Sequence, residues 1–216
     1  MSSRKLVIVT GFEPFGNFTV NPSWEAARAL NGREIKSSKI KSFNIPLEYR
    51  EIKHKIESLI DKHEPSVLIS LGQSPRPVIS LEKVALNFAD LTESHTPYNC
   101  GSQPFDELLE VSAPAAYFTN LPVRKILNRL RENKIPSEIS YNAGTFGCNQ
   151  IFYSTMNKII KDKLKIIAGF IHVPSLPAQV AAIQKSKKTT IPSMDLHTII
   201  RALEITIETT LENMTC

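Results

Sequence analysis

The stretch that decides the fold is Lys5-Leu-Val-Ile-Val-Thr10, a short apolar run that ends at Gly11. Two further runs have the same character, Val67-Leu-Ile-Ser-Leu71 and Ile166-Ile-Ala-Gly-Phe-Ile171. None of the three alternates apolar with polar residues, which is typical of strands in a parallel sheet that helices cover on both faces. We therefore predict that these runs form central strands.

Four helices are expected around these strands. Residues 49–63 place apolar side chains at helical spacing, and so do residues 122–133, 148–161 and 193–213. Ser193 is expected to cap the last helix, and Ile160 is expected to face inward from the third. Residues 78–88 predict an extra strand pair or one bent strand. The alternation of strands and helices predicts an α/β domain with helices on both sides of a mostly parallel sheet.

Length and composition set outer limits on function. The 216 residues suit one domain over residues 1–216, and no repeat or linker is visible. No apolar run approaches the ~20 residues of a membrane span, and the first residues do not resemble a signal peptide, so a cytoplasmic protein without a membrane partner is expected. Three cysteines without a C-x-x-C pair argue against a disulfide framework and against a zinc site.

The net charge of +5 raises the possibility of nucleic-acid binding. The lysines are scattered, however, and no aromatic residues interleave with the denser clusters to stack on bases. A solvated basic surface is the better interpretation, and no nucleic-acid partner is expected.

The run from Tyr141 to Tyr153 places Cys148 between a small-residue turn and an amphipathic helix. The N–H groups and dipole of a helix start favour thiolate over thiol, and a backbone N–H there can receive an oxyanion. The alternative is an unreactive buried cysteine. Cys100 and Cys216 are interpreted as a loop thiol and a tail thiol, and whether either crosslinks subunits stays open.

Reactive groups of open α/β sheets gather beyond the carboxyl ends of strands. Three segments have that placement: residues 11–16, 72–76 and 170–174. His172 lies in the last of them, and it alone among the five histidines follows a buried run. A histidine there could meet Cys148, although a hydrogen-bonded core histidine is the alternative.

A Cys–His pair needs a third group that orients the imidazole, usually a carboxylate or an amide. Glu82 is a single acidic residue among apolar neighbours in a predicted strand. It could equally point outward, since alternate strand residues face opposite ways. Asp90 and Asp106 are competing candidates.

Several segments taken together resemble the pyroglutamyl peptidase I family of cysteine peptidases. They are Gly11-Phe-Glu-Pro-Phe-Gly16 with Asn21-Pro-Ser-Trp24, Ser80-Leu-Glu82 with Val84-Ala-Leu-Asn87, Ala143-Gly-Thr-Phe-Gly-Cys148-Asn149, and Phe170-Ile-His172-Val-Pro174 with Leu176-Pro-Ala-Gln-Val180. Tyr117-Phe-Thr-Asn-Leu-Pro122 and Pro192-Ser-Met194 also fit, so the resemblance runs nearly from end to end.

The resemblance implies an exopeptidase that hydrolyses an N-terminal pyroglutamyl residue from small peptides through a thioacyl-enzyme intermediate. It implies Cys148 as nucleophile, His172 as general base and acid, and Glu82 as the group that orients His172. The implied fold is a three-layer α/β/α sandwich. The family needs no metal or organic cofactor, and it is typically cytoplasmic and homotetrameric.

A flat, uncharged lactam needs apolar walls and amide hydrogen-bond partners. By resemblance, Phe12 and Phe15 supply the walls, with Phe146 as a further candidate. Gln73 and Asn21 are candidates for the lactam amide. Ordinary core packing is the alternative for Phe12 and Phe15.

Two positions depart from the family pattern. Gly147 stands where the family usually has a bulkier residue, often valine, so a pocket wall is expected to be missing and the turn to be looser. The loop of residues 89–97 lacks the arginine that the family tends to carry, and His95 is expected near the missing side chain. We expect this loop to lower turnover more than it alters specificity. If so, His95→Arg should raise kcat.

Alternatives from other classes remain. A catalytically weakened homologue would bind pyroglutamyl peptides without cleaving them. A nucleoside phosphorylase has a related architecture, but no glycine-rich or arginine-lined phosphate cradle is evident in the sequence.

Overall fold

The computed structural model describes residues 5–16, 18–91, 98–186 and 191–214, without the side chains of residues 184–186. Within them, seven strands form one sheet in the order β2-β3-β1-β4-β9-β5-β8. The bounds are β1 (Leu6–Phe12), β2 (Glu34–Ile35), β3 (Ser38–Ile45), β4 (Val67–Gln73), β5 (Ile79–Glu82), β8 (Ser137–Ser140) and β9 (Ile167–Val173). The neighbours β3, β1, β4 and β9 are parallel, β5 is antiparallel to β9, and β8 is parallel to β5. The sheet is thus mixed and mostly parallel.

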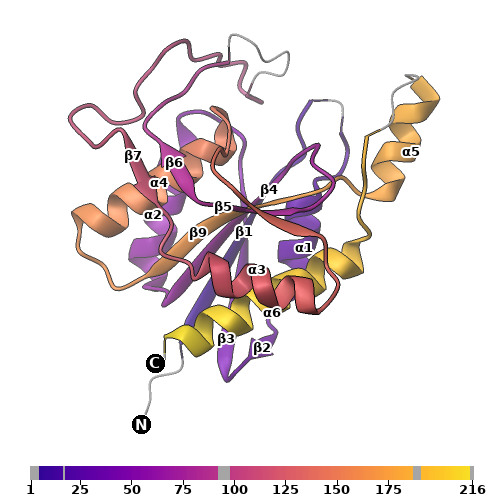
Figure 1. Cartoon of the computed structure of the whole chain (residues 1–216). Helices are drawn as coiled ribbons and strands as arrows, with labels where there is room; N and C mark the ends of the chain where they lie inside the picture. The colour runs from indigo at the N-terminus through magenta and orange to yellow at the C-terminus, as the bar shows by residue number, and fades with distance from the viewer. Residues whose placement is uncertain (1–4, 17, 92–97, 187–190, 215–216) are drawn as a thin grey trace.

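Helices cover both faces of this sheet (Figure 1). Their bounds are α1 (Pro22–Leu30), α2 (Glu51–His63), α3 (Val123–Glu132), α4 (Gly147–Lys161), α5 (Pro177–Ser186) and α6 (Leu196–Asn213). Alternate residues of each central strand enter different cores. Val7 and Val9 pack with α1, α3 and α6, whereas Ile8 packs with α2 and α4. This division explains why the central strands are mostly apolar and do not alternate with polar residues, and the predicted α/β fold with helices on both faces is confirmed.

The predicted helices are present with shifted boundaries and two corrections. Asp195, not Ser193, caps α6, because its carboxylate accepts a hydrogen bond from the backbone N–H of Thr198. Ile160 does not face inward but is 50% exposed on α4. The short helices α1 and α5 were not predicted. Asn21 caps α1 by accepting from the N–H of Ser23, and Pro22 follows it in the first turn.

The segment of residues 78–88 divides between two sheets. Its first half is β5 in the main sheet, and its second half is β6 (Val84–Leu86), which pairs with β7 (Ala116–Phe118) in a small antiparallel sheet. Asn149 of α4 holds β6 in place by accepting from the N–H of Leu86 and donating to its carbonyl. None of the helices in the described ranges is both long and apolar enough to span a bilayer.

Candidate active site

The candidate site lies on the sheet face that α2 and α4 cover. His172 is next to last in β9 and lies beside Gly72 of β4 and Ser80 of β5. Residues paired directly across strands point to the same face, and so do residues two apart on one strand. His172, Phe170, Gly72 and Glu82 therefore all face α4, which carries Cys148. This convergence joins segments that are 90 positions apart in the chain.

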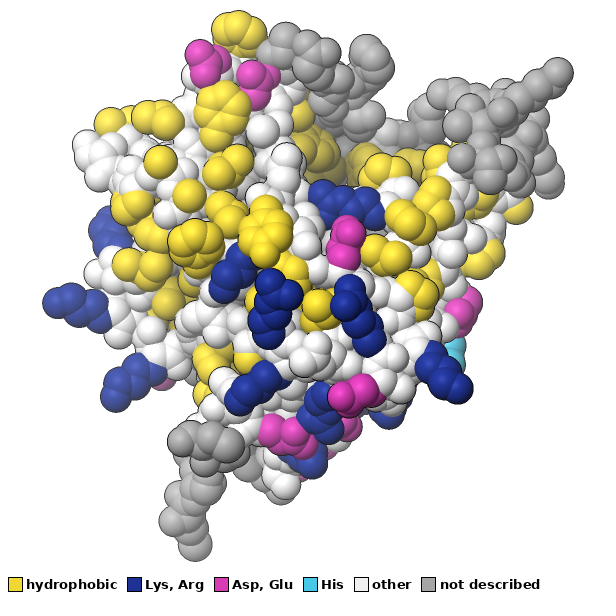
Figure 2. Space-filling view, in the orientation of Figure 1, with side chains coloured by type: hydrophobic (Ala, Val, Ile, Leu, Met, Phe, Trp, Pro, Cys, Tyr) yellow, Lys and Arg dark blue, Asp and Glu magenta, His cyan; other side chains and the backbone are white. Residues whose placement is uncertain are grey.

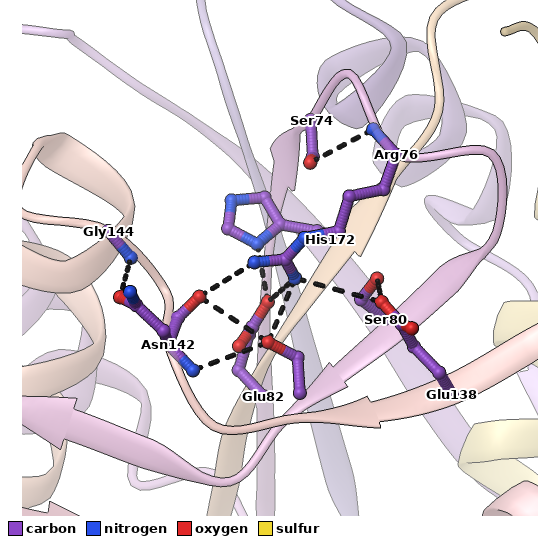
Figure 3. Close-up of polar contacts among 9 residues, drawn as sticks. Ser74, Arg76, Ser80, Glu82, Glu138, Asn142, Gly144 and His172 are labelled. Atoms are coloured by element: carbon purple, nitrogen blue, oxygen red, sulfur yellow. Dashed lines mark hydrogen bonds and ion pairs between the residues drawn. The ribbon is translucent and has the colours of Figure 1, made fainter.

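Glu82 lies diagonally across from His172, and the two side chains meet. Glu82 Oε1 lies 2.7 Å from His172 Nδ1, with the carboxylate fully buried and His172 6% exposed (Figure 3). An ionised carboxylate only accepts hydrogen bonds, so Nδ1 carries the proton and Nε2 is the nitrogen available as a base. Of the carboxylates considered from the sequence (Glu82, Asp90 and Asp106), Glu82 is the one that the structure describes in contact with His172.

Arg76 binds the same carboxylate oxygen. Its Nη1 lies 2.7 Å from Glu82 Oε1 and 2.9 Å from Ser140 Oγ, and its Nη2 donates to the carbonyl of Asn142 at 2.8 Å (Figure 3). The guanidinium therefore joins the end of β5 to the loop between β8 and α4. Glu82 Oε2 is buried without a hydrogen-bond partner among the described residues.

Gly72 leaves room for the thiol of Cys148. A Cβ on Gly72 would lie 2.6 Å from Cys148 Sγ and 2.7 Å from the Phe170 ring, both far closer than van der Waals contact. The sulfur thus lies over a glycine whose neighbour in the next strand is His172. The small residue brings the thiol close to the sheet on the side of the imidazole.

The electrostatic setting of Cys148 differs from the expectation of a helix start. Burial raises the pKa of the thiol to about 12, and the Glu82 carboxylate acts in the same direction. The residue's own backbone N–H and the charge of Arg76 lower the pKa, but they do not offset the burial. Burial therefore outweighs the start of α4, and the resting group at neutral pH is a thiol that needs a base.

Aromatic side chains gather beside the thiol. Phe146, the residue that precedes α4, lies 6.5 Å from Phe15 and 4.4 Å from Tyr98 between ring centroids. Phe15 also meets Phe18 at 5.6 Å, and both Phe15 and Phe146 are partly exposed. Phe12 is only 2% exposed and belongs to the core. Of the three predicted wall residues, Phe15 and Phe146 are therefore the accessible ones.

The two amides proposed for a lactam are already hydrogen-bonded within the protein. Asn21 Oδ1 accepts from Ser23, and its Nδ2 donates to the carbonyl of Glu13 at 2.9 Å. Gln73 Nε2 donates to Ser175 Oγ at 2.9 Å, while its Oε1 receives a long contact of 3.4 Å from Gln179. The Gln73 amide is thus held by a longer hydrogen bond at its oxygen than the Asn21 amide.

Gly147 faces packed side chains, among them Tyr98, whose Cε1 would lie 3.6 Å from an added Cβ. A Cβ there would lie 2.5 Å from Leu47 Cδ1 and 3.3 Å from Ile52 Cδ1, in the core beneath α4. Leu47 occupies the space that a side chain would need, so the expected missing pocket wall is wrong. The absent side chain belongs to the packing between α2 and α4.

His95 lies outside the described residues, as does most of the loop that lacks the arginine. The described part of this region ends at Leu91 and resumes at Tyr98. In the described ranges, no group of three or more His, Cys, Asp or Glu side chains is arranged to hold a metal ion.

Sequence reasoning missed the roles of two residues. Arg76 was seen only as part of a loop after a strand. The available signal was an arginine beyond the carboxyl end of a central strand, six residues before a single buried glutamate. The sequence predicts no role for Tyr98, although this side chain is 1% exposed and donates to Gln150 Oε1 at 3.1 Å.

Comparisons with known proteins show the family to which the chain belongs. A family model described as pyroglutamyl peptidase matches residues 5–213. The pyrrolidone-carboxylate peptidase of Bacillus subtilis is 44% identical over 203 residues, covering 94% of this chain and 90% of that protein. Pyroglutamyl peptidase I of Bacillus amyloliquefaciens has a similar structure, with a TM-score of 0.88, 39% identity and coverage of 96% and 95% of the two chains. A mutant pyrrolidone carboxyl peptidase from Pyrococcus furiosus has a TM-score of 0.92 at 33% identity, covering 96% of this chain and 99% of that one.

Proposed function

Since the chain belongs to the pyroglutamyl peptidase family, we propose that it is a cysteine peptidase that hydrolyses the N-terminal pyroglutamyl residue from peptides. Its substrates are small peptides with that blocked terminus. The observation that carries the assignment is the buried contact of 2.7 Å between Glu82 and His172, beside the glycine over which Cys148 Sγ lies.

The proposed roles follow from the geometry. His172 Nε2 takes the proton of the Cys148 thiol, and the thiolate attacks the pyroglutamyl carbonyl carbon to form a tetrahedral oxyanion. His172 then returns the proton to the departing amine, leaving a thioester. Water, deprotonated by His172, hydrolyses the thioester and releases pyroglutamate and the free thiol. Glu82 holds the Nδ1 proton throughout, so Nε2 stays the reactive nitrogen.

A high thiol pKa makes the base indispensable in this scheme. With the pKa of Cys148 near 12, only a small fraction of the thiol is ionised at neutral pH without help. The imidazole must therefore accept the proton during attack. The backbone N–H at the start of α4 is the proposed donor to the oxyanion, and one such donor contributes about 3 kcal/mol in comparable enzymes.

We assign the pyroglutamyl ring to the aromatic side chains beside the thiol. Phe15 and Phe146 supply apolar walls for a flat uncharged ring. Gln73, rather than Asn21, is the proposed partner of the lactam amide, because its Oε1 has the longer internal hydrogen bond. Among the described residues, a charged N-terminal ammonium would find no compensating anion between these rings, so we expect ordinary N-termini to be rejected.

Release of fluorophore from pyroglutamyl-aminomethylcoumarin tests the activity. Wild type should cleave the substrate under reducing conditions without added phosphate, and Cys148→Ala should not. Cys100→Ala, which removes an exposed thiol, is the matched control and should retain activity. Binding without cleavage by the wild type would favour the weakened homologue, and turnover that requires phosphate would favour a phosphorylase.

We also propose that copies of the chain assemble into a homo-oligomer, a tetramer by resemblance. Large apolar side chains exposed by half or more support this, among them Phe105, Leu108, Val111 and Phe118. Figure 2 shows hydrophobic side chains gathered around the part of the molecule formed by β6 and β7. Light scattering should give a multiple of the 24.2 kDa chain mass, and Val111→Ser with Phe118→Ser should reduce it. A monomeric wild type would contradict the proposal.

We assign the enzyme to the cytoplasm, where free thiols stay reduced. An essential Cys148 thiol needs such surroundings. Cell fractionation tests the assignment, and recovery mainly from a secreted or membrane fraction would oppose it.

A further inference from the structure

Arg76 stands apart from the proposed reaction yet contacts both halves of the site. Its guanidinium binds the carboxylate that holds His172, and it also binds the loop that leads to Cys148. A buried carboxylate is costly unless it is paired and hydrogen-bonded. Glu82 is fully buried, and Arg76 is the cation in contact with it among the described residues.

The contact also determines how the carboxylate is oriented. Arg76 Nη1 and His172 Nδ1 bind the same oxygen, each at 2.7 Å. A carboxylate oxygen has two lone pairs, so both donors can be accepted together. Any rotation of the carboxylate that moves this oxygen away from His172 Nδ1 also moves it away from Arg76.

The second half of the guanidinium fixes the approach to α4. Nη2 donates to the Asn142 carbonyl at 2.8 Å, and Nη1 also meets Ser140 Oγ at 2.9 Å. Asn142 itself closes a turn, since its side chain accepts from the N–H of Gly144 at 2.8 Å. Cys148 follows four residues later at the second position of the helix. Arginine suits this place because its planar fork aims several donors at once, whereas lysine offers a compact point charge.

We propose that Arg76 is a positioning residue. By binding both Glu82 and the loop of residues 140–144, it determines where the His172 imidazole lies relative to the Cys148 thiol. The proposal rests on the proposed function for its kinetic consequence, but the placement of the charge can be tested without turnover. The positive charge of Arg76 also lowers the pKa of the Cys148 thiol, against the effect of burial.

The experiment compares Arg76→Met and Arg76→Lys with wild type. Arg33→Met is the matched control, because Arg33 also pairs with a glutamate at 2.7 Å, but on the α6 side of the molecule. We expect Arg76→Met to lower kcat about 100-fold with KM within about twofold, since a misplacement of about 1 Å costs that much. Arg76→Lys should lower kcat by about tenfold, and Arg33→Met should change neither constant.

Alkylation of Cys148 by iodoacetamide provides the second measurement, read by mass spectrometry of the Cys148 peptide so that Cys100 does not interfere. Arg76→Met should slow the reaction at least about threefold because the thiolate loses a nearby cation. Arg76→Lys should react at nearly the wild-type rate. A merely loosened loop would instead expose the thiol and speed alkylation in both variants.

Three results would overturn the proposal: a kcat of Arg76→Met within about threefold of wild type, a change confined to KM, or faster alkylation. If Arg76→Met does not fold, Arg76→Lys carries the test, since it retains the charge beside Glu82, and a wild-type kcat in that variant would refute the positioning role. If wild type itself never cleaves the substrate, the proposed function fails while the alkylation comparison still tests the placement of Arg76.

Discussion

Gly72→Ala should impair turnover far more than it destabilises the fold. The added Cβ would lie 2.6 Å from Cys148 Sγ and 2.7 Å from Phe170 Cζ. A comfortable carbon–sulfur contact is about 1 Å longer, so the sulfur, the Phe170 ring or the strand must move by about that amount. Because Gly72 lies directly beside His172, the movement changes the distance between thiol and imidazole.

The two consequences differ in size. A displacement of about 1 Å in a reacting group costs on the order of 100-fold in rate. Overpacking by one methyl costs about 1–3 kcal/mol of unfolding free energy. For a chain of this length that lowers Tm by about 2–4 °C for each kcal/mol. A variant that is still fully folded at 25 °C should therefore have lost most of its kcat.

Gly169→Ala is the matched control. Gly169 lies on β9, and its Cβ would meet Thr119 Oγ1 at 2.3 Å and Leu121 Cδ1 at 2.4 Å. Gly169 is three residues before His172, so it faces the opposite side of the sheet. The control should lose comparable stability in thermal unfolding, with kcat for pyroglutamyl-aminomethylcoumarin within about threefold of wild type in the folded protein.

A double-mutant cycle isolates the sulfur. The quantity measured is the free energy of unfolding. Gly72→Ala should lower it by about 1 kcal/mol less in a Cys148→Ala background, where the sulfur is absent, than in wild type. Two results would refute the inference that the thiol lies over Gly72. One is a wild-type kcat in Gly72→Ala, and the other is an equal loss of unfolding free energy in the two backgrounds.

The other predictions concern packing, ionisation and capping. Gly147→Val should lower the free energy of unfolding by about 2 kcal/mol, measured with urea. Adding Leu47→Ala makes room for the valine, so the double mutant should be more stable than the sum of the two single losses predicts; a strictly additive loss would contradict this. The folded pKa of Cys148 lies near 12, above the ordinary 9.0 of a thiol, so its contribution to stability is complete below pH 9 and is lost as pH rises toward 12. Wild type should therefore lose more stability than Cys148→Ala between pH 9 and 11, and parallel curves would oppose this. Asp195→Ala should lower Tm by about 2–4 °C, whereas Ser193→Ala should not. Hydrogen bonding to Thr198 holds the pKa of Asp195 below its usual value, so protonation in acid removes this stabilisation and the difference between the two variants should vanish there.

Local pattern was sufficient for the layers of this fold. Short-range patterns predict the central strands and four helices. A strand buried on both faces is mostly apolar, and a helix with one buried face repeats apolar residues every three to four positions. The same patterns do not predict the helices α1 and α5. Asn21 was interpreted as a substrate ligand, whereas a side chain that caps a helix has the same polarity.

The candidate site was predictable in its residues but not in its geometry. Glu82, Cys148 and His172 could be named from separate segments and from a resemblance. That the Glu82 side chain faces His172 rather than solvent depends on β5 running antiparallel to β9, a pairing between segments 90 positions apart that no local pattern encodes.

The sequence by itself determined the α/β class, the apolar strands and the chemical groups available for catalysis. Tertiary structure alone decided three matters: that Gly72 clears a place for Cys148, that Gly147 faces Leu47, and that Arg76 joins Glu82 to the loop before α4. The physical reason is distance along the chain. Burial, ion pairing and van der Waals contact act through space. The pairs Gly72 and Cys148, Gly147 and Leu47, and Arg76 and Asn142 each join segments too far apart in sequence to leave a periodic trace.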